Sequence, residues 1–209
     1  MKVFISGTDT GVGKTLISSW LAIHTGFSYF KPIQTGTNYG NDSEEIRRLS
    51  DAQTYPECYS YCESLSPHLA ARIENDRIDM EKICLPREDN LIIEGAGGLL
   101  VPMNDKHFMV DLIKKFEAPA VLVSRTELGT INHTLLSLEA LRSRDIEVLG
   151  VIMNGESNAE NKRAIEFYGN TSVIAEFPRL YKIDQHALKT IELPETLVRI
   201  LRSRNRDSF

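Results

Sequence analysis

The sequence lacks the features that mark several large classes of protein. No apolar run among its 209 residues approaches the ~18 residues that a transmembrane helix needs. Positive charge is limited, because 24 lysines and arginines face 29 aspartates and glutamates. The resulting formal net charge of -5 disfavours nucleic-acid binding through a basic face. These absences predict a protein with no membrane partner and no nucleic-acid partner.

Cysteine is also scarce. Cys58, Cys62 and Cys84 form an odd, sparse set, which argues for a reducing compartment rather than a disulfide framework. The C-x3-C spacing of the first two differs from the C-x2-C of common zinc ribbons. Apolar residues begin at Val3, so we expect no signal peptide. We therefore expect a cytoplasmic protein whose thiols are inert and at least half-buried.

The composition is that of a globular chain, with 42% hydrophobic and 25% charged residues. A length of 209 residues predicts a single domain spanning 1–209, large enough to bury a core without a metal or disulfide. Short apolar runs alternate with longer amphipathic stretches. Strands are predicted at 3–6, 29–30, 91–94, 120–123, 148–153 and 172–175, and helices at 15–25 and 131–143.

The predicted strands are apolar on both faces, which is typical of a parallel sheet covered by helices on both sides. We expect an α/β fold with a doubly wound, mostly parallel sheet. The stretch 38–89 is less regular, and we expect an insertion of helices and loops over the strand ends. Residues 197–202 predict a last helix packed on the sheet, with a membrane-surface helix as the alternative.

The strongest local pattern is the glycine-rich stretch from Gly7 to Thr15, which follows a predicted strand and opens a predicted helix. Glycines let successive backbone N–H groups surround phosphate oxygens, and the helix N-terminus adds partial positive charge. A lysine and a hydroxyl at its end suit the β- and γ-phosphates and Mg²⁺. The nucleotide-binding residues predicted here are Gly11, Val12, Gly13, Lys14, Thr15 and Leu16. The fold thus resembles that of P-loop NTPases.

This loop departs from the strict form, since Thr8 stands where the first glycine belongs. Residues 9–15 look like the loop of the MinD/ParA-type ATPases, in which a signature lysine stands at the position of Asp9. An anion at that position cannot cross a dimer interface to touch a partner's phosphate. We expect this loop to bind nucleotide without that switch.

Two further strand ends carry charged residues. Glu94 ends a buried strand and is followed by Gly95, Ala96 and Gly97, so it is placed to approach Mg²⁺ while the glycines admit phosphate. Lys31 ends another strand, and ligands in such sheets lie beyond the carboxyl ends of the strands. It should therefore face the same crevice as the loop lysine, an arrangement that suits transfer of a phosphoryl group to an anionic acceptor.

Together these pieces resemble the dethiobiotin synthetase family, the ATP-dependent enzymes that close the ureido ring in biotin synthesis. The matching motifs are Gly7-Thr8-Asp9-Thr10, Gly13-Lys14-Thr15, Lys31-Pro32, Thr35-Gly36, Ser66-Pro67-His68, Glu94 to Gly98, Leu128-Gly129, Ile131-Asn132-His133 and Asn154. They run in order from residue 7 to about residue 180 and cover most of the chain.

The resemblance implies 7,8-diaminononanoate, CO₂ and ATP as substrates, with Mg²⁺ as cofactor. One amine captures CO₂ as a carbamate, the carbamate attacks the γ-phosphate, and the second amine closes the ring on a carbamic-phosphoric anhydride. Lys31 and Lys14 would be catalytic. The metal-associated residues would be Thr15, Asp42 and Glu94, the base-side residues Asn154, Gly155 and Pro178, and the substrate-binding residues Lys31, Thr35, Gly129, Ile131 and Asn132.

The resemblance also implies a homodimer in which the helix start after Gly129 serves the opposite subunit's site. One departure is Phe167, which falls where the family often has a tyrosine, with Tyr168 next to it. Two alternatives remain. A MinD/ParA-like regulatory switch ATPase is disfavoured by Asp9, and a cobalamin-pathway amide synthetase would need a glutaminase domain for which 209 residues leave no space.

Overall fold

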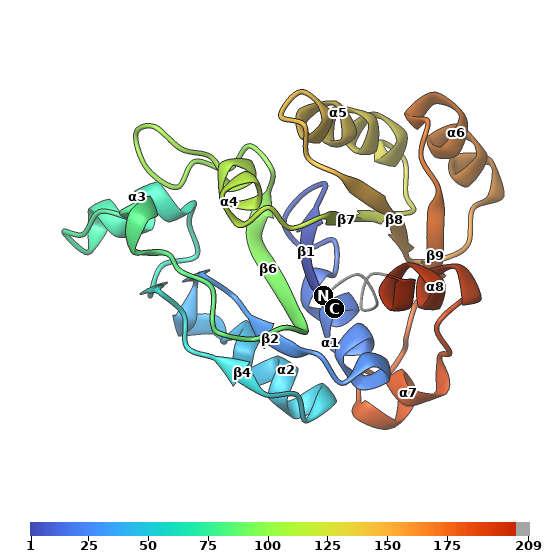
Figure 1. Cartoon of the computed structure of the whole chain (residues 1–209), viewed down its shortest axis with the longest axis horizontal. Coiled ribbons are helices and arrows are strands. Elements are labelled where there is room, and N and C mark those ends of the chain that lie inside the picture. The colour runs from blue at the N-terminus through green and yellow to red at the C-terminus, as the bar shows by residue number, and fades with distance from the viewer. Residues whose placement is uncertain (204–209) are drawn as a thin grey trace.

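A seven-stranded parallel sheet forms the centre of the molecule (Figure 1). The computed structural model describes residues 1–203, with side chains described to residue 201. The strands lie in the order β4-β2-β6-β1-β7-β8-β9. Their bounds are β1 Lys2–Gly7, β2 Ser28–Phe30, β4 Thr54–Tyr55, β6 Leu91–Gly98, β7 Ala120–Arg125, β8 Val148–Asn154 and β9 Val173–Phe177. Every adjacent pair is parallel, which confirms the predicted α/β fold.

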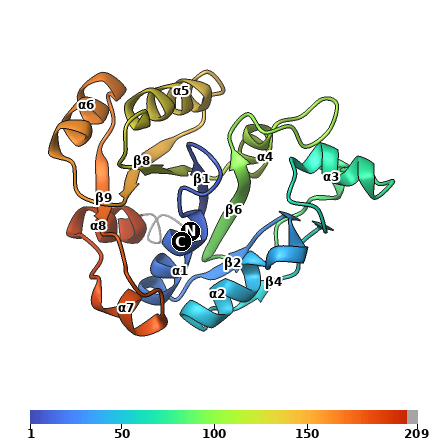
Figure 2. The same ribbon diagram turned by 180° about the vertical axis from the view of Figure 1, so that it is seen from behind.

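Helices cover both faces of this sheet (Figures 1 and 2). One face packs against α1 (Lys14–Thr25), α2 (Asp42–Ser50), α7 (Gln185–Thr190) and α8 (Glu195–Ser203). The other packs against α4 (Met109–Phe116), α5 (Thr130–Arg142) and α6 (Ala159–Gly169). Helix α3 (Pro67–Ile73) packs against the short strands β3 (Ile33–Thr35) and β5 (Tyr59–Tyr61) beside the main sheet. The chain also forms 3-10 turns at Thr37–Tyr39 and Met80–Lys82.

Strand β1 shows why its sequence gives a buried parallel strand. Val3 and Ile5 point into the core on the α1 face, whereas Phe4 points into the core on the α4 face. All three side chains are fully buried. A strand with apolar residues on both faces is stable only between two helical layers. The strand ends at Gly7, and the C-terminus of α1 is capped by Gly26, whose left-handed φ of 71° suits glycine.

The segment 38–89 differs from the predicted insertion of helices and loops. It contains β4, which adds to the edge of the main sheet beside β2, and β5 (Tyr59–Tyr61). Strand β5 pairs in parallel with β3 (Ile33–Thr35) to form a separate two-stranded sheet. These strands have only two or three residues, too few for a hydrophobic period to show in the sequence.

The prediction that the thiols are at least half-buried is wrong, because Cys58, Cys62 and Cys84 are all exposed. All three lie in the segment 38–89. The last helix is confirmed as packed on the core, since Leu197 and Leu201 of α8 are buried beside β9. No helix in the described part of the chain is long and apolar enough to cross a membrane.

Candidate active site

The glycine-rich loop joins β1 to α1 at the carboxyl edge of the sheet. Gly11 and Gly13 have φ angles of 72° and 94°, a left-handed conformation that side chains oppose. A Cβ at Gly13 would also lie 2.1 Å from Nδ2 of Asn154, so the position admits no side chain. The Nζ of Lys14 donates to the carbonyl of Asp9 at 3.1 Å, which folds the lysine back over the loop.

Lys14 is buried, with 7% of its surface exposed. Burial lowers the pKa of Lys14 to about 8, and nearby Lys31 adds to the lowering while Glu94 opposes it. Because burial disfavours the charged ammonium of Lys14, any anion that approaches it stabilises that charged form. The loop therefore presents a lysine whose charged form a phosphate would stabilise.

Beside the loop, one hydroxyl lies between two carboxylates. Oγ1 of Thr15 lies 3.0 Å from Oδ1 of Asp42 and 2.9 Å from Oε1 of Glu94. Ser18 donates to the second oxygen of Glu94 at 2.7 Å, and Glu94 is completely buried. Helix α1, the start of α2 and strand β6 supply these groups, so residues far apart in the sequence meet at one point.

Lys31 forms ion pairs with both carboxylates. Its Nζ contacts Oδ2 of Asp42 and lies 3.4 Å from Oε1 of Glu94. Burial acts to lower the pKa of Lys31, but the two carboxylates outweigh it and hold that pKa above its ordinary value. The pKa of Asp42 is lowered, because Lys31 and Thr15 outweigh the effect of burial. Lys31 and Asp42 are thus held in their charged forms.

These residues line one cavity of about 650 Å³. Of the residues predicted from the sequence it includes Gly11, Gly13, Lys14, Thr15, Lys31, Thr35, Asp42, Glu94, Ala96 and Gly97. The sequence reasoning missed Gln34, whose Oε1 accepts the backbone N–H of Asp42 at 3.3 Å. Its place in the chain between Lys31, which follows β2, and Thr35, which ends β3, was the available signal.

The donor set fits a magnesium ion. A hydroxyl and two carboxylates are hard oxygen ligands, and Mg²⁺ is commonly held by one or two carboxylates together with substrate phosphates. No group of three His, Cys, Asp or Glu side chains in the described chain is arranged to hold a metal by itself. Thr15, Asp42 and Glu94 would hold the ion, and phosphates would complete its coordination.

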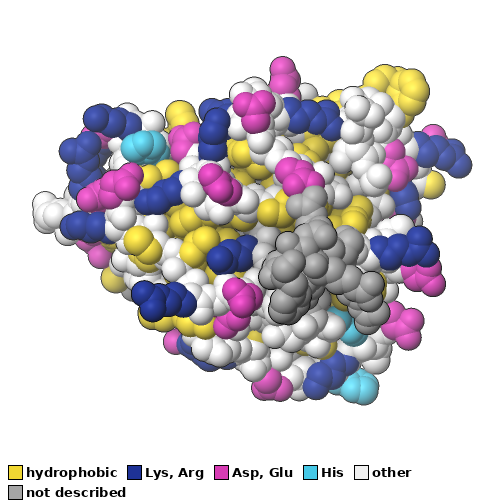
Figure 3. Space-filling view, viewed as in Figure 1, with side chains coloured by type: hydrophobic (Ala, Val, Ile, Leu, Met, Phe, Trp, Pro, Cys, Tyr) yellow, Lys and Arg dark blue, Asp and Glu magenta, His cyan; other side chains and the backbone are white. Residues whose placement is uncertain are grey.

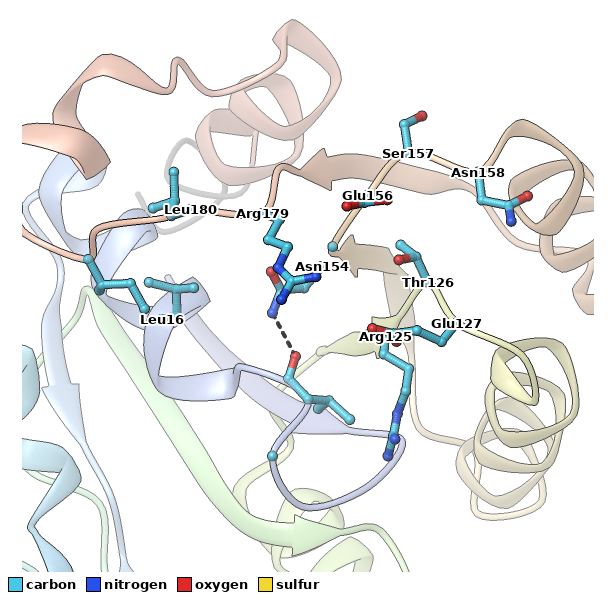
Figure 4. A pocket seen from close by; sticks show the side chains of 14 residues that line it. Leu16, Arg125, Thr126, Glu127, Asn154, Glu156, Ser157, Asn158, Arg179 and Leu180 are labelled. Atoms are coloured by element: carbon cyan, nitrogen blue, oxygen red, sulfur yellow. Dashed lines mark hydrogen bonds between the residues drawn. The ribbon is translucent and has the colours of Figure 1, made fainter.

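A second cavity, of about 670 Å³, lies on the other side of the loop (Figure 4). Of the predicted residues it includes Gly11, Val12, Leu16, Asn154 and Gly155. Nδ2 of Asn154 donates to the carbonyl of Val12 at 2.9 Å, so the end of β8 is bonded to the loop. The cavity also contains charged residues that the sequence reasoning missed, Arg125, Glu127, Glu156 and Arg179.

Arg125 ends β7 and forms an ion pair with Asp9, at 3.0 Å between Nη2 and Oδ2. The two residues are 116 positions apart, and no local pattern connects them. Asp9, which is notable in the sequence only as a departure from a lysine, is therefore the acceptor for an arginine of its own chain.

Some predicted residues lie outside both cavities. Gly95 packs against the core, where an added Cβ would meet Phe4 and Met109. Pro178 is exposed directly after β9, next to the cavity residue Arg179. The three residues predicted at the start of α5, Gly129, Ile131 and Asn132, line neither cavity of their own chain.

The fold and the site define a class. A parallel sheet, a glycine-rich loop after β1 and a Lys-Thr pair opening α1 are the parts of a P-loop nucleotide-binding protein. The sequence matches the AAA domain family over residues 1–187. The fold is similar to that of a ParA family ATPase from Chlorobium tepidum, with a TM-score of 0.58 and 14% identity over 96% of this chain and 98% of the other. At that identity the likeness shows the fold alone.

More similar relatives define the family. The chain is 51% identical to the ATP-dependent dethiobiotin synthetase BioD of Lawsonia intracellularis, over 94% of this chain and 97% of the relative. It is 49% identical to the BioD of Paramagnetospirillum magneticum, over 85% and 88% of the two chains. The chain belongs to the family of ATP-dependent dethiobiotin synthetases. The predicted family and the prediction of a cyclo-ligase are confirmed.

Proposed function

We propose that the protein carboxylates 7,8-diaminononanoate with CO₂ and closes the product to dethiobiotin, using ATP and Mg²⁺. The observation that carries this proposal is the cavity that holds two buried lysines, Lys14 and Lys31, beside two carboxylates and a hydroxyl. Joining an anionic carbamate to an anionic phosphate needs this concentration of positive charge. The names of the relatives support the same role in biotin synthesis.

The proposed reaction has three steps. One substrate amine attacks CO₂ and loses a proton, giving a carbamate. A carbamate oxygen then attacks the γ-phosphorus, the bond from this phosphorus to ADP breaks, and a carbamic-phosphoric anhydride is formed. The second amine attacks the carbonyl carbon of this anhydride, phosphate leaves, and the cyclic urea is formed. Each ATP is thus converted to ADP and phosphate as one ring closes.

The two lysines take different roles in these steps. Lys31 holds the carbamate oxygens through its ammonium, which is oriented by Asp42 and Glu94. Lys14 lies over the loop and holds the β- and γ-phosphates. Mg²⁺, when bound by Thr15, Asp42 and Glu94, neutralises phosphate charge. The closed, buried surroundings of both lysines strengthen each of these interactions.

The nucleoside end of ATP is proposed to lie in the second cavity. Asn154 and Gly155 line this cavity at the end of β8, and Pro178 stands beside it after β9. The backbone of Gly95, Ala96 and Gly97 follows Glu94 at the opposite side of the loop, where Ala96 and Gly97 line the first cavity. In this arrangement the loop lies between the base and the reacting phosphates.

We also propose a homodimer with shared sites. Thr35 lines the substrate side of the first cavity, but the α5 start at Gly129, Ile131 and Asn132 does not. Free backbone N–H groups at this helix start suit a carboxylate, which the diamine substrate carries far from its amines. A two-fold axis would bring each helix start to the partner's cavity.

An exposed apolar surface supports this dimer. Leu128 is fully exposed before α5, Leu136 is exposed on α5, and Phe167 and Tyr168 are 79% and 70% exposed on α6. Figure 3 shows hydrophobic side chains projecting at the upper right of the molecule, over α6. Such a surface favours contact with a second chain. Elsewhere on this face acidic and basic side chains are interspersed.

Phosphate release tests the proposed reaction. The purified protein is mixed with ATP, Mg²⁺ and ¹³C-bicarbonate, with and without 7,8-diaminononanoate, and product mass is measured. We expect phosphate to appear only with the diamine, in a 1:1 ratio to a cyclic urea that carries one ¹³C. Phosphate release that is independent of the diamine would contradict the proposal.

A further inference from the structure

Arg125 connects the phosphate loop to the second cavity. Its side chain runs from the end of β7 toward the loop between β1 and α1 (Figure 4). Nη2 forms the 3.0 Å ion pair with Asp9, while the residue also lines the cavity beside Gly11, Val12 and Leu16. The guanidinium is therefore placed between the loop and the cavity.

Both ends of this ion pair are fixed by further hydrogen bonds. Oδ1 of Asp9 accepts a hydrogen bond from the backbone N–H of Thr10 at 2.7 Å, and the backbone carbonyl of Asp9 accepts one from Nζ of Lys14 at 3.1 Å. The carbonyl of Arg125 accepts the hydroxyl of Thr130 at 2.6 Å. Asp9 thus holds Lys14 with its backbone and Arg125 with its side chain. Two cations are oriented by one residue of the loop.

The guanidinium has donors left over. An arginine carries five N–H donors, and here the contact with Asp9 engages Nη2. Its Nε is buried and has no hydrogen-bond partner among the described residues. A buried donor without a partner costs free energy, so an acceptor supplied by a ligand would be favourable. Phosphate oxygens suit a guanidinium through two parallel hydrogen bonds.

We propose that Arg125 is a further nucleotide-binding residue, which donates to the α- and β-phosphates while Asp9 holds it in place. We assign these two phosphates from the neighbours of Arg125. It lies with Gly11, Val12 and Leu16 in the second cavity, whereas Lys14 and Thr15 line the first cavity, which contains the proposed metal ligands. The inference rests on the proposed use of ATP. It adds a phosphate contact that comes from β7, outside the loop and its helix.

The test compares ADP and ATP binding to the full chain by calorimetry. Arg125→Gln should weaken both nucleotides by a similar factor of about 10 to 100, because both carry the α- and β-phosphates. Arg125→Lys should recover part of this loss. Asp9→Asn should show a smaller loss, because the guanidinium remains but loses its partner.

Arg48→Gln is the matched control, since Arg48 is an exposed arginine paired with Glu45 on α2. It should leave both affinities unchanged. Unchanged ADP affinity in Arg125→Gln would overturn the proposal, and so would a loss confined to ATP. An equal loss in Arg125→Gln and Arg125→Lys with a lowered melting temperature would also overturn it, as a structural effect. Failure of the wild type to bind ADP would instead count against the proposed function itself.

Discussion

The two cavities beside the phosphate loop are nearly equal in size but differ in how they hold charge. We call the first cavity, of about 650 Å³, the metal side because it contains the proposed Mg²⁺ ligands; its residues Lys14, Lys31 and Glu94 are at most 7% exposed. We call the second cavity, of about 670 Å³, the base side because it is proposed to hold the nucleoside; there the side chain of Arg125 is 40% exposed and Arg179 is exposed. Charge is buried where a phosphoryl group would be transferred and solvated where a nucleotide would be recognised.

This difference has a physical consequence. Charges that are removed from water interact strongly, because the surrounding dielectric is low, whereas exposed charges are screened. Deleting a buried charge also leaves its partner without compensation. Substitutions on the metal side should therefore change the chemistry, and those on the base side should mainly change affinity. The predictions below test that contrast.

The largest effect is expected at Lys31. Lys31→Gln should lower turnover by roughly 10²–10³, the usual loss for one charge-stabilising donor, and largely spare ATP binding. Lys14→Ala should damage nucleotide binding and turnover together, because Lys14 lies on the loop itself. Steady-state turnover and calorimetry on the same preparations separate the two. Near-normal turnover of Lys31→Gln at saturating substrate would remove Lys31 from the chemistry.

A shared site should show as recovered activity. Lys14→Ala and Gly129→Trp should each be nearly inactive, because each damages a different part of every site. Random subunit exchange makes half of the dimers mixed, each with one intact site, so activity should return to about one quarter of wild type. Gly129→Ala controls for backbone strain at φ 96°. Exchange that mass spectrometry verifies, with no recovered activity, would refute the shared site.

Metal dependence should follow the burial of the two carboxylates. Glu94→Gln should raise the half-saturating Mg²⁺ concentration by about 10-fold and slow phosphoryl transfer. Asp42→Asn should act in the same direction but less strongly, because the Asp42 side chain is 30% exposed and that of Glu94 is not exposed. Magnesium titrations of turnover measure both. Curves that overlay wild type for both variants would rule out this metal site.

The smallest effect is expected on the base side. Asn154→Ala removes the 2.9 Å hydrogen bond to Val12 and one amide from the second cavity. One such bond contributes about 1 kcal/mol, so the KM for ATP should rise roughly fivefold with little change in turnover. Thr171→Ala, a change outside both cavities, serves as the control. A turnover loss in Asn154→Ala as large as that in Lys31→Gln would contradict the expected difference between the two cavities.

Local sequence patterns predicted the fold and the phosphate loop because the information they need is local. Glycines at 11 and 13, the lysine that follows and the carboxylate Glu94 within β6 all stand next to apolar strand residues that mark their position. The parallel sheet follows from strands that are apolar on both faces. These features can be read within ten residues, without knowledge of the tertiary structure.

The features that could not be predicted depend on contacts between distant segments. The ion pair of Asp9 with Arg125 joins residues 116 positions apart, and Lys31 meets Glu94 across 63 positions. Strands β3, β4 and β5 exist because neighbouring strands complete their hydrogen bonds, not because their own residues show a pattern. The exposure of the cysteines likewise depends on the tertiary structure around them.

The hydrogen bond from Asn154 to the carbonyl of Val12 joins the second cavity to the phosphate loop, and it therefore holds the two cavities in place relative to each other. Nδ2 of Asn154 is bonded to the loop, and any side chain at Gly13 would collide with it, so the end of β8 and the loop keep a fixed separation. The distance between the proposed base site and the proposed phosphate site is thereby fixed, so the two cavities together select a nucleotide by its length. A residue inserted into the loop would therefore disturb the proposed base site and the proposed phosphate site together. Variation among homologues is therefore expected in the rim of the second cavity, not in the spacing between these two elements.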